Sequence, residues 1–80
     1  HDMKPQELRK YDVLYSDKTE YLIIGLTPRA ILVKFQDNET RLTRKTWVPM
    51  YRIKNLQEVE STEDNLGKSY TCDGLIDKTK

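Results

Sequence analysis

Apolar residues in the first two thirds of the chain form short runs separated by polar turns. The clearest run covers residues 30–36, which are rich in β-branched and aromatic side chains and are followed by the turn-forming residues 37–39. This pattern is typical of a buried strand that enters a hairpin. We therefore expect a central strand at 30–36, with Ile31 and Val33 in the core.

Two more strands are predicted before this one, at residues 11–15 and 20–27. The four polar residues between them have the length and composition of a hairpin turn. Tyr21 and Ile23 share one face of the second strand, because side chains on a strand alternate with a period of two. Gly25 in the same run predicts a bulge or a sharp bend, which a small curled sheet requires.

Beyond the central strand, residues 40–43 are predicted to pair back on it as a fourth strand. Residues 44–50 have no clean period and contain a proline, so they predict a loop or a single 3₁₀ turn that plugs the sheet with Trp47 and Val48. Residues 51–56 complete the pattern as a closing strand.

The two ends of the chain lack this pattern. Residues 1–10 are interpreted as a lead-in with at most one helical turn, residues 11–57 as the β domain, and residues 58–80 as an acidic tail. The tail is poor in large apolar residues and contains several turn formers, so we expect disorder there. Tyr70 and the pair 75–76 are the exceptions that could dock on the domain.

Short strands at this spacing predict an all-β fold. For a single domain of 80 residues, the best fit is a small five-stranded barrel of the Src-homology-3-like class, partly open, with a 3₁₀ turn before the last strand and a flexible C-terminal tail. An oligonucleotide-binding fold ranks second, because it normally needs a longer chain and a helix between its strands.

The net charge of +1 hides an uneven distribution. Residues 1–56 hold eleven Lys or Arg against seven Asp or Glu, whereas residues 57–80 hold three against six. No apolar run approaches the roughly 20 residues of a membrane span, so no membrane partner is expected. The single Cys72 excludes an internal disulfide framework and favours an intracellular protein. Two residues precede Met3, which could be a natural start.

The residues needed for catalysis or for a structural metal site are scarce. The only histidine is His1 and the only cysteine is Cys72, so neither a nucleophile–base pair nor a four-ligand zinc site is expected. Carboxylates in or beside the predicted turns serve the backbone in most proteins. They are Asp17, Glu20, Asp37 and Glu39. We expect no enzymatic activity, no cofactor and no metal.

Aromatic residues gather around the predicted hairpins. Tyr15 ends the first strand, Tyr21 begins the second, and Phe35 ends the third with Asp37 two positions further on. Together with Gly25 and the Trp-Val-Pro segment before the last predicted strand, this order resembles the Tudor domain family over most of the β domain.

The resemblance implies a reader of methylated lysine or arginine in protein tails, in a chromatin or nucleoprotein setting and in the nucleus. Tyr15, Tyr21 and Phe35 would be the walls of an aromatic cage, which attracts a methylated ammonium group through the ring quadrupoles, and Asp37 would be its acidic partner. Tyr15 stands where tryptophan is common in that family, and Arg41 lies near the position of a further aromatic wall.

The same aromatic residues also have a purely structural interpretation. Phe35 shares a strand face with Ile31 and Val33, which favours a place in the core. Tyr15 and Tyr21 flank one turn, so they could form a simple cross-strand pair.

A cluster of basic residues with one tryptophan suggests a second function, binding of DNA or RNA. Basic groups bind phosphate, and an aromatic ring among them can stack on unpaired bases. The residues are Lys34, Arg41, Arg44, Lys45, Trp47, Arg52 and Lys54. Alternatively, these charges only solvate a β surface and protect strand edges. A small protein-binding regulator that pairs through a strand edge is a third possibility.

Overall fold

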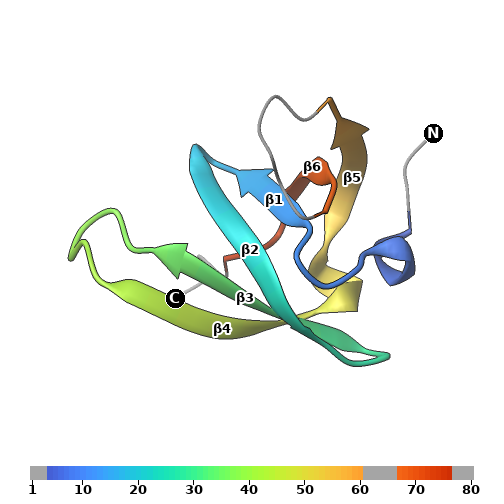
Figure 1. The fold of residues 1–80 in the computed structure, drawn as a ribbon, viewed down its shortest axis with the longest axis horizontal. Helices are drawn as coiled ribbons and strands as arrows, with labels where there is room; N and C mark the ends of the chain where they lie inside the picture. Colours follow the sequence, from blue (N-terminus) through green and yellow to red (C-terminus); the bar gives the residue numbers. More distant parts are fainter. Residues whose placement is uncertain (1–3, 61–66, 77–80) are drawn as a thin grey trace.

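The computed structural model of the chain describes residues 4–60 and 67–76. Within these residues the secondary structure consists of strands and two short 3₁₀ turns. In chain order the elements are η1 (Pro5–Glu7), β1 (Val13–Ser16), β2 (Thr19–Leu26), β3 (Ala30–Gln36), β4 (Thr43–Pro49), η2 (Met50–Arg52), β5 (Lys54–Val59) and β6 (Ser69–Asp73). The protein is therefore all-β, as predicted (Figure 1).

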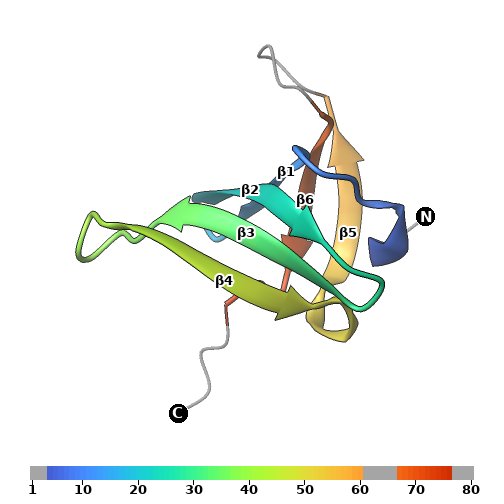
Figure 2. The ribbon, with the colours of Figure 1, turned by 60° about the horizontal axis from the view of Figure 1, so that its bottom comes forward.

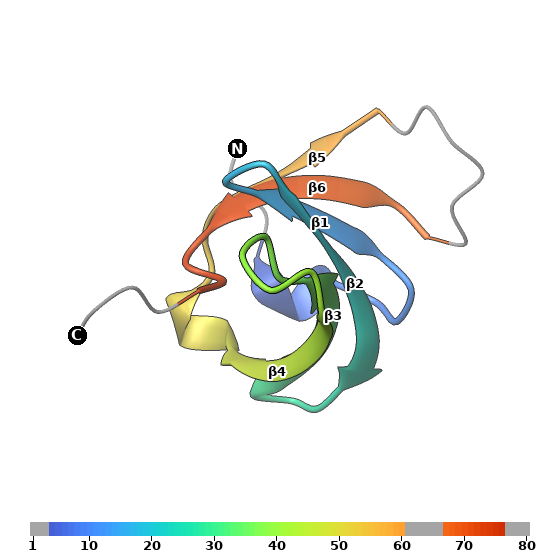
Figure 3. The same cartoon turned by 90° about the vertical axis from the view of Figure 1, so that its left-hand side faces the viewer.

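The strands form one six-stranded sheet in the order β4-β3-β2-β1-β6-β5. All neighbouring pairs are antiparallel except β1 and β6, which are parallel. Seen end-on in Figure 3, the sheet curls from β5 and β6 through β1 and β2 to β3 and β4, and η2 connects the two ends. The sheet has six strands where five were predicted, and its edge strands β4 and β5 are not paired with each other.

The first half of the sheet follows the prediction closely. β3 has the predicted bounds, and Ile31 and Val33 are both fully buried. The pairing of β2 with β3 shifts register between Ile23 and Gly25, which confirms the predicted bulge. A two-residue turn connects β1 to β2, and the φ angles of Asp17 and Lys18 are 53° and 67°. Positive φ at both positions is the geometry of a type I′ turn, whose twist suits a hairpin.

The predicted pairing of a fourth strand with the central strand is confirmed, but the predicted bounds of 40–43 are wrong, as is the loop predicted for residues 44–50. Trp47, which was predicted to plug the sheet, is 52% exposed, whereas Val48 is buried. Residues 43–49 form β4, which pairs with β3 along its whole length, and the turn before it is longer than expected. In that turn the amide of Arg41 donates to the carbonyl of Asp37, and the amide of Asp37 donates to the carbonyl of Leu42. Pro49 ends an edge strand, where no donor is needed for a ladder, so it does not interrupt the strand. The predicted 3₁₀ turn follows at Met50–Arg52, directly before β5.

The expectation of a disordered tail is also wrong for the described part of residues 58–80. β5 continues to Val59, and residues 69–73 form β6 between β1 and β5. Tyr70 and Cys72 are buried on either side of the exposed Thr71, and Leu75 is buried as well. Tyr70 and Cys72 lie on a strand that pairs with two neighbours, and Leu75 adds a buried contact just after it. Residues 61–66 and 77–80, which the same expectation covers, lie outside the described residues.

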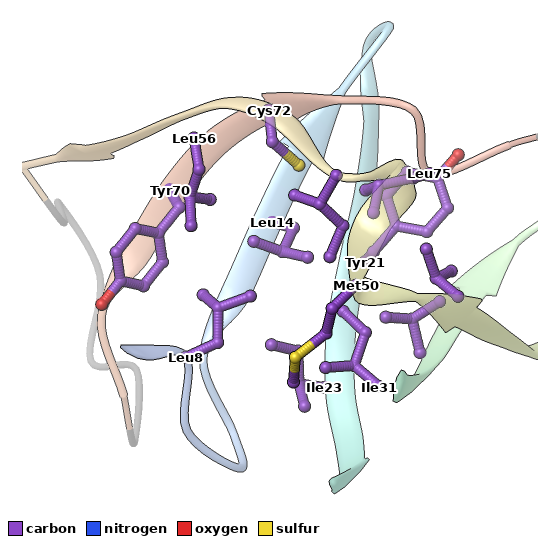
Figure 4. Close-up of a cluster of buried hydrophobic side chains, with 13 residues drawn as sticks. Leu8, Leu14, Tyr21, Ile23, Ile31, Met50, Leu56, Tyr70, Cys72 and Leu75 are labelled. Carbon is purple, nitrogen blue, oxygen red and sulfur yellow. The ribbon is translucent and has the colours of Figure 1, made fainter. Parts of the chain in front are cut away.

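The core lies inside the curl of the sheet (Figure 4). Residues from every strand contribute to it, and Leu8 joins them from the lead-in after η1 with no exposed surface. Asp12 fastens this lead-in to the chain before β6. Its carboxylate accepts hydrogen bonds from the amide of Arg9 at 2.9 Å and from the amide of Lys68 at 2.9 Å. Asp12 is buried, and both of its carboxylate oxygens are thereby satisfied.

Candidate functional site

An open groove with a volume of about 940 Å³ lies at one end of the sheet. Three segments that are far apart in the sequence border it: the β1–β2 turn, the β3–β4 turn and the residues after β6. Figure 2 shows the β3–β4 turn extended away from the N-terminal segment and β5. The side-chain amide of Asn38 donates to the hydroxyl of Thr19 at 3.1 Å and ties the first two of these segments together.

An aromatic pair forms the floor of the groove. The ring centroids of Tyr21 and Phe35 are 4.9 Å apart, and the ring planes are inclined by 45°. Tyr21 is only 3% exposed, whereas Phe35 is partly buried and packs against the edge of the core. Phe35 therefore contacts the core, as its structural interpretation predicts, and also lines the groove.

Tyr15 does not line this groove. In the β1–β2 register Leu14 is opposite Tyr21, and Tyr15 is opposite Glu20. Because directly opposed residues share a face and successive residues alternate, Tyr15 lies on the outer face of the sheet. It borders a separate, shallower hollow next to β5 and β6. The structure thus brings Tyr21, Phe35 and Asp37 together and leaves Tyr15 apart from them.

Asp37 lies at the rim of the groove and organises the β3–β4 turn. Its Oδ1 accepts hydrogen bonds from the amides of Glu39 at 2.8 Å and Thr40 at 3.2 Å. Its Oδ2 forms an ion pair with Nε of Arg44 at 3.0 Å. The two amide hydrogen bonds, followed by the positive charge of Arg44, lower the pKa of Asp37 below its ordinary value. Asp37 therefore stays ionised at neutral pH while serving the backbone of the turn.

The charge around the groove is predominantly negative. Four carboxylate residues line it against a single basic residue, Arg44. The four are Asp17, Asp37, Glu39 and Asp73. Since an opposite charge within a partly enclosed hollow is favoured over a like charge, this groove suits a cationic group.

The third wall of the groove comes from residues 73–76 of the supposed tail, where the sequence suggested docking of residues 75–76 but not a place in a groove. Leu75 is buried at the groove, and Ile76 is 39% exposed beside it. Arg52 holds this segment in place: its Nε donates to the carbonyl of Gly74 at 3.0 Å, and its terminal nitrogen donates to the carbonyl of Leu75 at 2.9 Å. Gly74 has a φ of 89°, a conformation that glycine adopts without strain. The sequence signal for this wall is Tyr70-x-Cys72 at period two, followed by a turn at Gly74.

The residues proposed for nucleic-acid binding do not form one surface. Arg44 points into the groove, and Arg52 is engaged with backbone carbonyls. Arg41 lies in the β3–β4 turn, and Lys54 lies on β5, at the far edge of the sheet. Lys34, Lys45 and Trp47 remain together on the outer face of β3 and β4.

Reactive groups are few in the described part of the chain. Burial raises the pKa of the Cys72 thiol to about 12, so at neutral pH it is a protonated, buried side chain. Among residues 4–60 and 67–76, no group of three or more His, Cys, Asp or Glu side chains is placed to hold a metal ion. No described helix has the length and apolar character needed to span a membrane. His1 lies outside the described residues.

No protein-family model matches the chain, and neither a curated protein nor a solved structure matches it. Its function is therefore inferred from its own residues.

Proposed function

We propose that this protein is a non-catalytic binding module whose groove takes a cationic side chain of a peptide. The observation that carries the proposal is the combination of four carboxylates and an aromatic pair around one open hollow. A cation gains from the carboxylates by charge and from the exposed part of the Phe35 ring by a cation–π contact worth about 0.5–2 kcal/mol.

The more specific form of the proposal is Tudor-like recognition of a methylated lysine or arginine, in a chromatin or nucleoprotein setting. Phe35 and Asp37, two positions apart, support it because both line the groove. The 3₁₀ turn directly before β5 supports a Src-homology-3-like arrangement of β1 to β5. Strand β6 is then an addition, which lies between β1 and β5. The cage would have one accessible aromatic wall, Phe35, with the buried Tyr21 ring packed behind it, rather than three walls.

A nitrogen–proton shift titration tests both forms of the proposal. Peptides that contain lysine, trimethyl-lysine, arginine or dimethyl-arginine are added to the labelled protein. We expect shifts confined to the β1–β2 turn, the β3–β4 turn and residues 73–76. Tighter binding of the methylated peptides supports the Tudor-like form, and equal binding of unmodified ones supports only a general cation site. Absence of shifts in these three segments would refute the groove as a binding site.

Paired substitutions identify the residues responsible. Phe35→Leu removes the ring but keeps an apolar contact with the core, and we expect it to weaken binding by about two- to thirtyfold. Tyr15→Leu is the matched control, because Tyr15 lies on the opposite face. This pair is preferable to Tyr21→Ala, which would open a cavity in the core. If both variants bind the peptide equally well, the Phe35 ring does not contribute to binding.

The carboxylates are tested in the same way. Glu39→Gln removes one negative charge from the groove rim, and we expect cationic peptides to bind about two- to fivefold more weakly. Glu20→Gln makes the same change on the outer face and should leave peptide binding unchanged.

A further inference from the structure

The outer face of β3 and β4 carries two lysines in direct opposition. Lys34 is paired with Lys45 in the β3–β4 register, and both are exposed. Like charges directly opposite each other on a sheet are unfavourable. Neither lysine forms an ion pair with a described carboxylate. The pair therefore concentrates positive charge at one place on the sheet, where it attracts an anion.

Trp47 lies beside these lysines on the same face. It is two residues beyond Lys45 on β4 and opposite Leu32 on β3, so the period of two places its indole on the lysine side of the sheet. It is the only tryptophan in the sequence and is 52% exposed. The exposed indole face is therefore accessible for stacking on a ligand.

A hollow of about 380 Å³ continues this surface toward the β1–β2 turn. Its lining includes Lys18 and Lys34 as basic residues and Glu20 as an acidic one. The acidic groove lies at the end of the sheet and on its inner face. Arg44, which lines that groove, is the residue before Lys45 on β4, so the two side chains lie on opposite faces of the strand. The outer face of β3 and β4 is thus positively charged, whereas the groove is negatively charged.

From this arrangement we infer that the outer basic face, Lys34, Lys45 and Trp47, binds single-stranded nucleic acid. The two ammonium groups neutralise backbone phosphates, and the exposed indole stacks on a base. Stacking on a side chain requires an unpaired base, because the faces of bases inside a duplex are covered by their neighbours. The ligand class is therefore a single strand rather than a duplex, and no particular base sequence is required.

Trp47 supplies its own reporter for the test. Its fluorescence is followed while an oligothymidylate of about 12 nucleotides is added at about 50 mM salt. We expect saturable quenching and an affinity that falls steeply with salt. Binding of a duplex of equal length serves as the comparison, and equal affinity for the duplex would overturn the assignment to single strands.

Substitutions locate the site. Lys34→Gln together with Lys45→Gln should weaken binding and reduce the slope of log affinity against log salt by about 1.4, since each phosphate contact on a single strand contributes about 0.7. Lys4→Gln with Lys54→Gln makes the same change of net charge elsewhere and should have a much smaller effect. Trp47→Leu, followed with a labelled oligonucleotide, should weaken binding about fivefold or more.

Three results would overturn the inference: no binding at low salt, an equal loss in the two lysine double variants, or competition by polyglutamate as effective as that by the oligonucleotide. The first result would reduce the outer face to a solvated β surface, and the other two would show that net charge alone attracts the oligonucleotide. Glu39→Gln should not weaken oligonucleotide binding, so failure of this site and failure of the groove are distinguishable. Unchanged backbone spectra of all the variants establish that they are folded.

Discussion

The two faces of the β3–β4 hairpin have opposite electrostatic character, although neighbouring residues build them. On the inner face Arg44 is paired with Asp37 in a groove that three further carboxylates line. On the outer face Lys45, the next residue, is opposite Lys34 and near an exposed tryptophan. A basic cluster in a sequence is therefore not a basic patch on a surface, because a strand divides it between two faces.

The two faces also differ in what they contribute to stability. The inner positions of β3 are the buried Ile31 and Val33 and the partly buried Phe35, whereas its outer positions are partly or fully exposed. We therefore expect stability to depend on the inner face, and ligand binding at the lysines and Trp47 to be separable from it.

The largest effect is expected from a matched pair of truncations on β3. Ile31→Ala removes a fully buried side chain and should lower the free energy of unfolding by about 2–5 kcal/mol. Leu32→Ala, one residue further on the outer face, should cost about 1 kcal/mol, because its side chain is only partly buried. Urea denaturation of both variants measures the difference. Equal losses would contradict the division into inner and outer faces.

A smaller loss is expected when the third wall of the groove is released. Arg52→Ala removes two charge-assisted hydrogen bonds to the carbonyls of Gly74 and Leu75. The expected cost is about 1–3 kcal/mol, together with weaker binding of cationic peptides in the groove. Arg29→Ala is the control, since Arg29 is exposed in the β2–β3 turn. If peptide binding survives the loss of Arg52 unchanged, residues 74–76 are not part of the site.

Buried strands with a continuous apolar run could be predicted from the sequence, whereas edge strands and strands ordered by long-range pairing could not. β3 has a continuous β-branched run between clear turns, so its bounds and core residues follow from local pattern alone. β4 begins with four polar, largely exposed residues and ends at Pro49, which gives an edge strand the appearance of a loop. β6 contains few apolar residues, and its order comes from pairing with β1, more than fifty residues away in the sequence.

The part of the groove formed by residues close together in sequence was predictable. Phe35 and Asp37 lie two residues apart at the end of one strand, and both reach the groove. Tyr15 and Tyr21 are close in sequence, but the type I′ turn sets a register that puts them on opposite faces. Arg44 and Leu75 enter the groove only because of the β3–β4 register and the added strand β6. Neither the β3–β4 register nor the position of β6 can be derived from a local sequence pattern.

An acid titration tests the inner face through Asp37. Its pKa in the folded protein lies below the ordinary value of 3.8, so the ionised form stabilises the fold above about pH 5. That contribution is lost as the pH falls through the lower, folded-state pKa. Asp37→Asn should therefore lower the unfolding midpoint at neutral pH, and the difference from the unsubstituted protein should shrink toward pH 2. Glu39→Gln controls for the loss of one carboxylate, and a difference that is constant with pH would contradict the assigned cause.

The smallest effects are expected from the adjacent pair Arg44 and Lys45, and they test the comparison most directly. Both substitutions to Gln remove one positive charge from β4 at exposed positions, so their effects on stability should be within about 0.5 kcal/mol of each other. Arg44→Gln frees the Asp37 carboxylate and should strengthen binding of cationic peptides about two- to fivefold, with little change in oligonucleotide binding. Lys45→Gln should do the reverse: weaken oligonucleotide binding by a similar factor and leave peptide binding unchanged. Because Arg44 and Lys45 are adjacent in sequence but lie on opposite faces of β4, identical responses of both variants to both ligands would show that net charge, and not the face of the strand, determines binding.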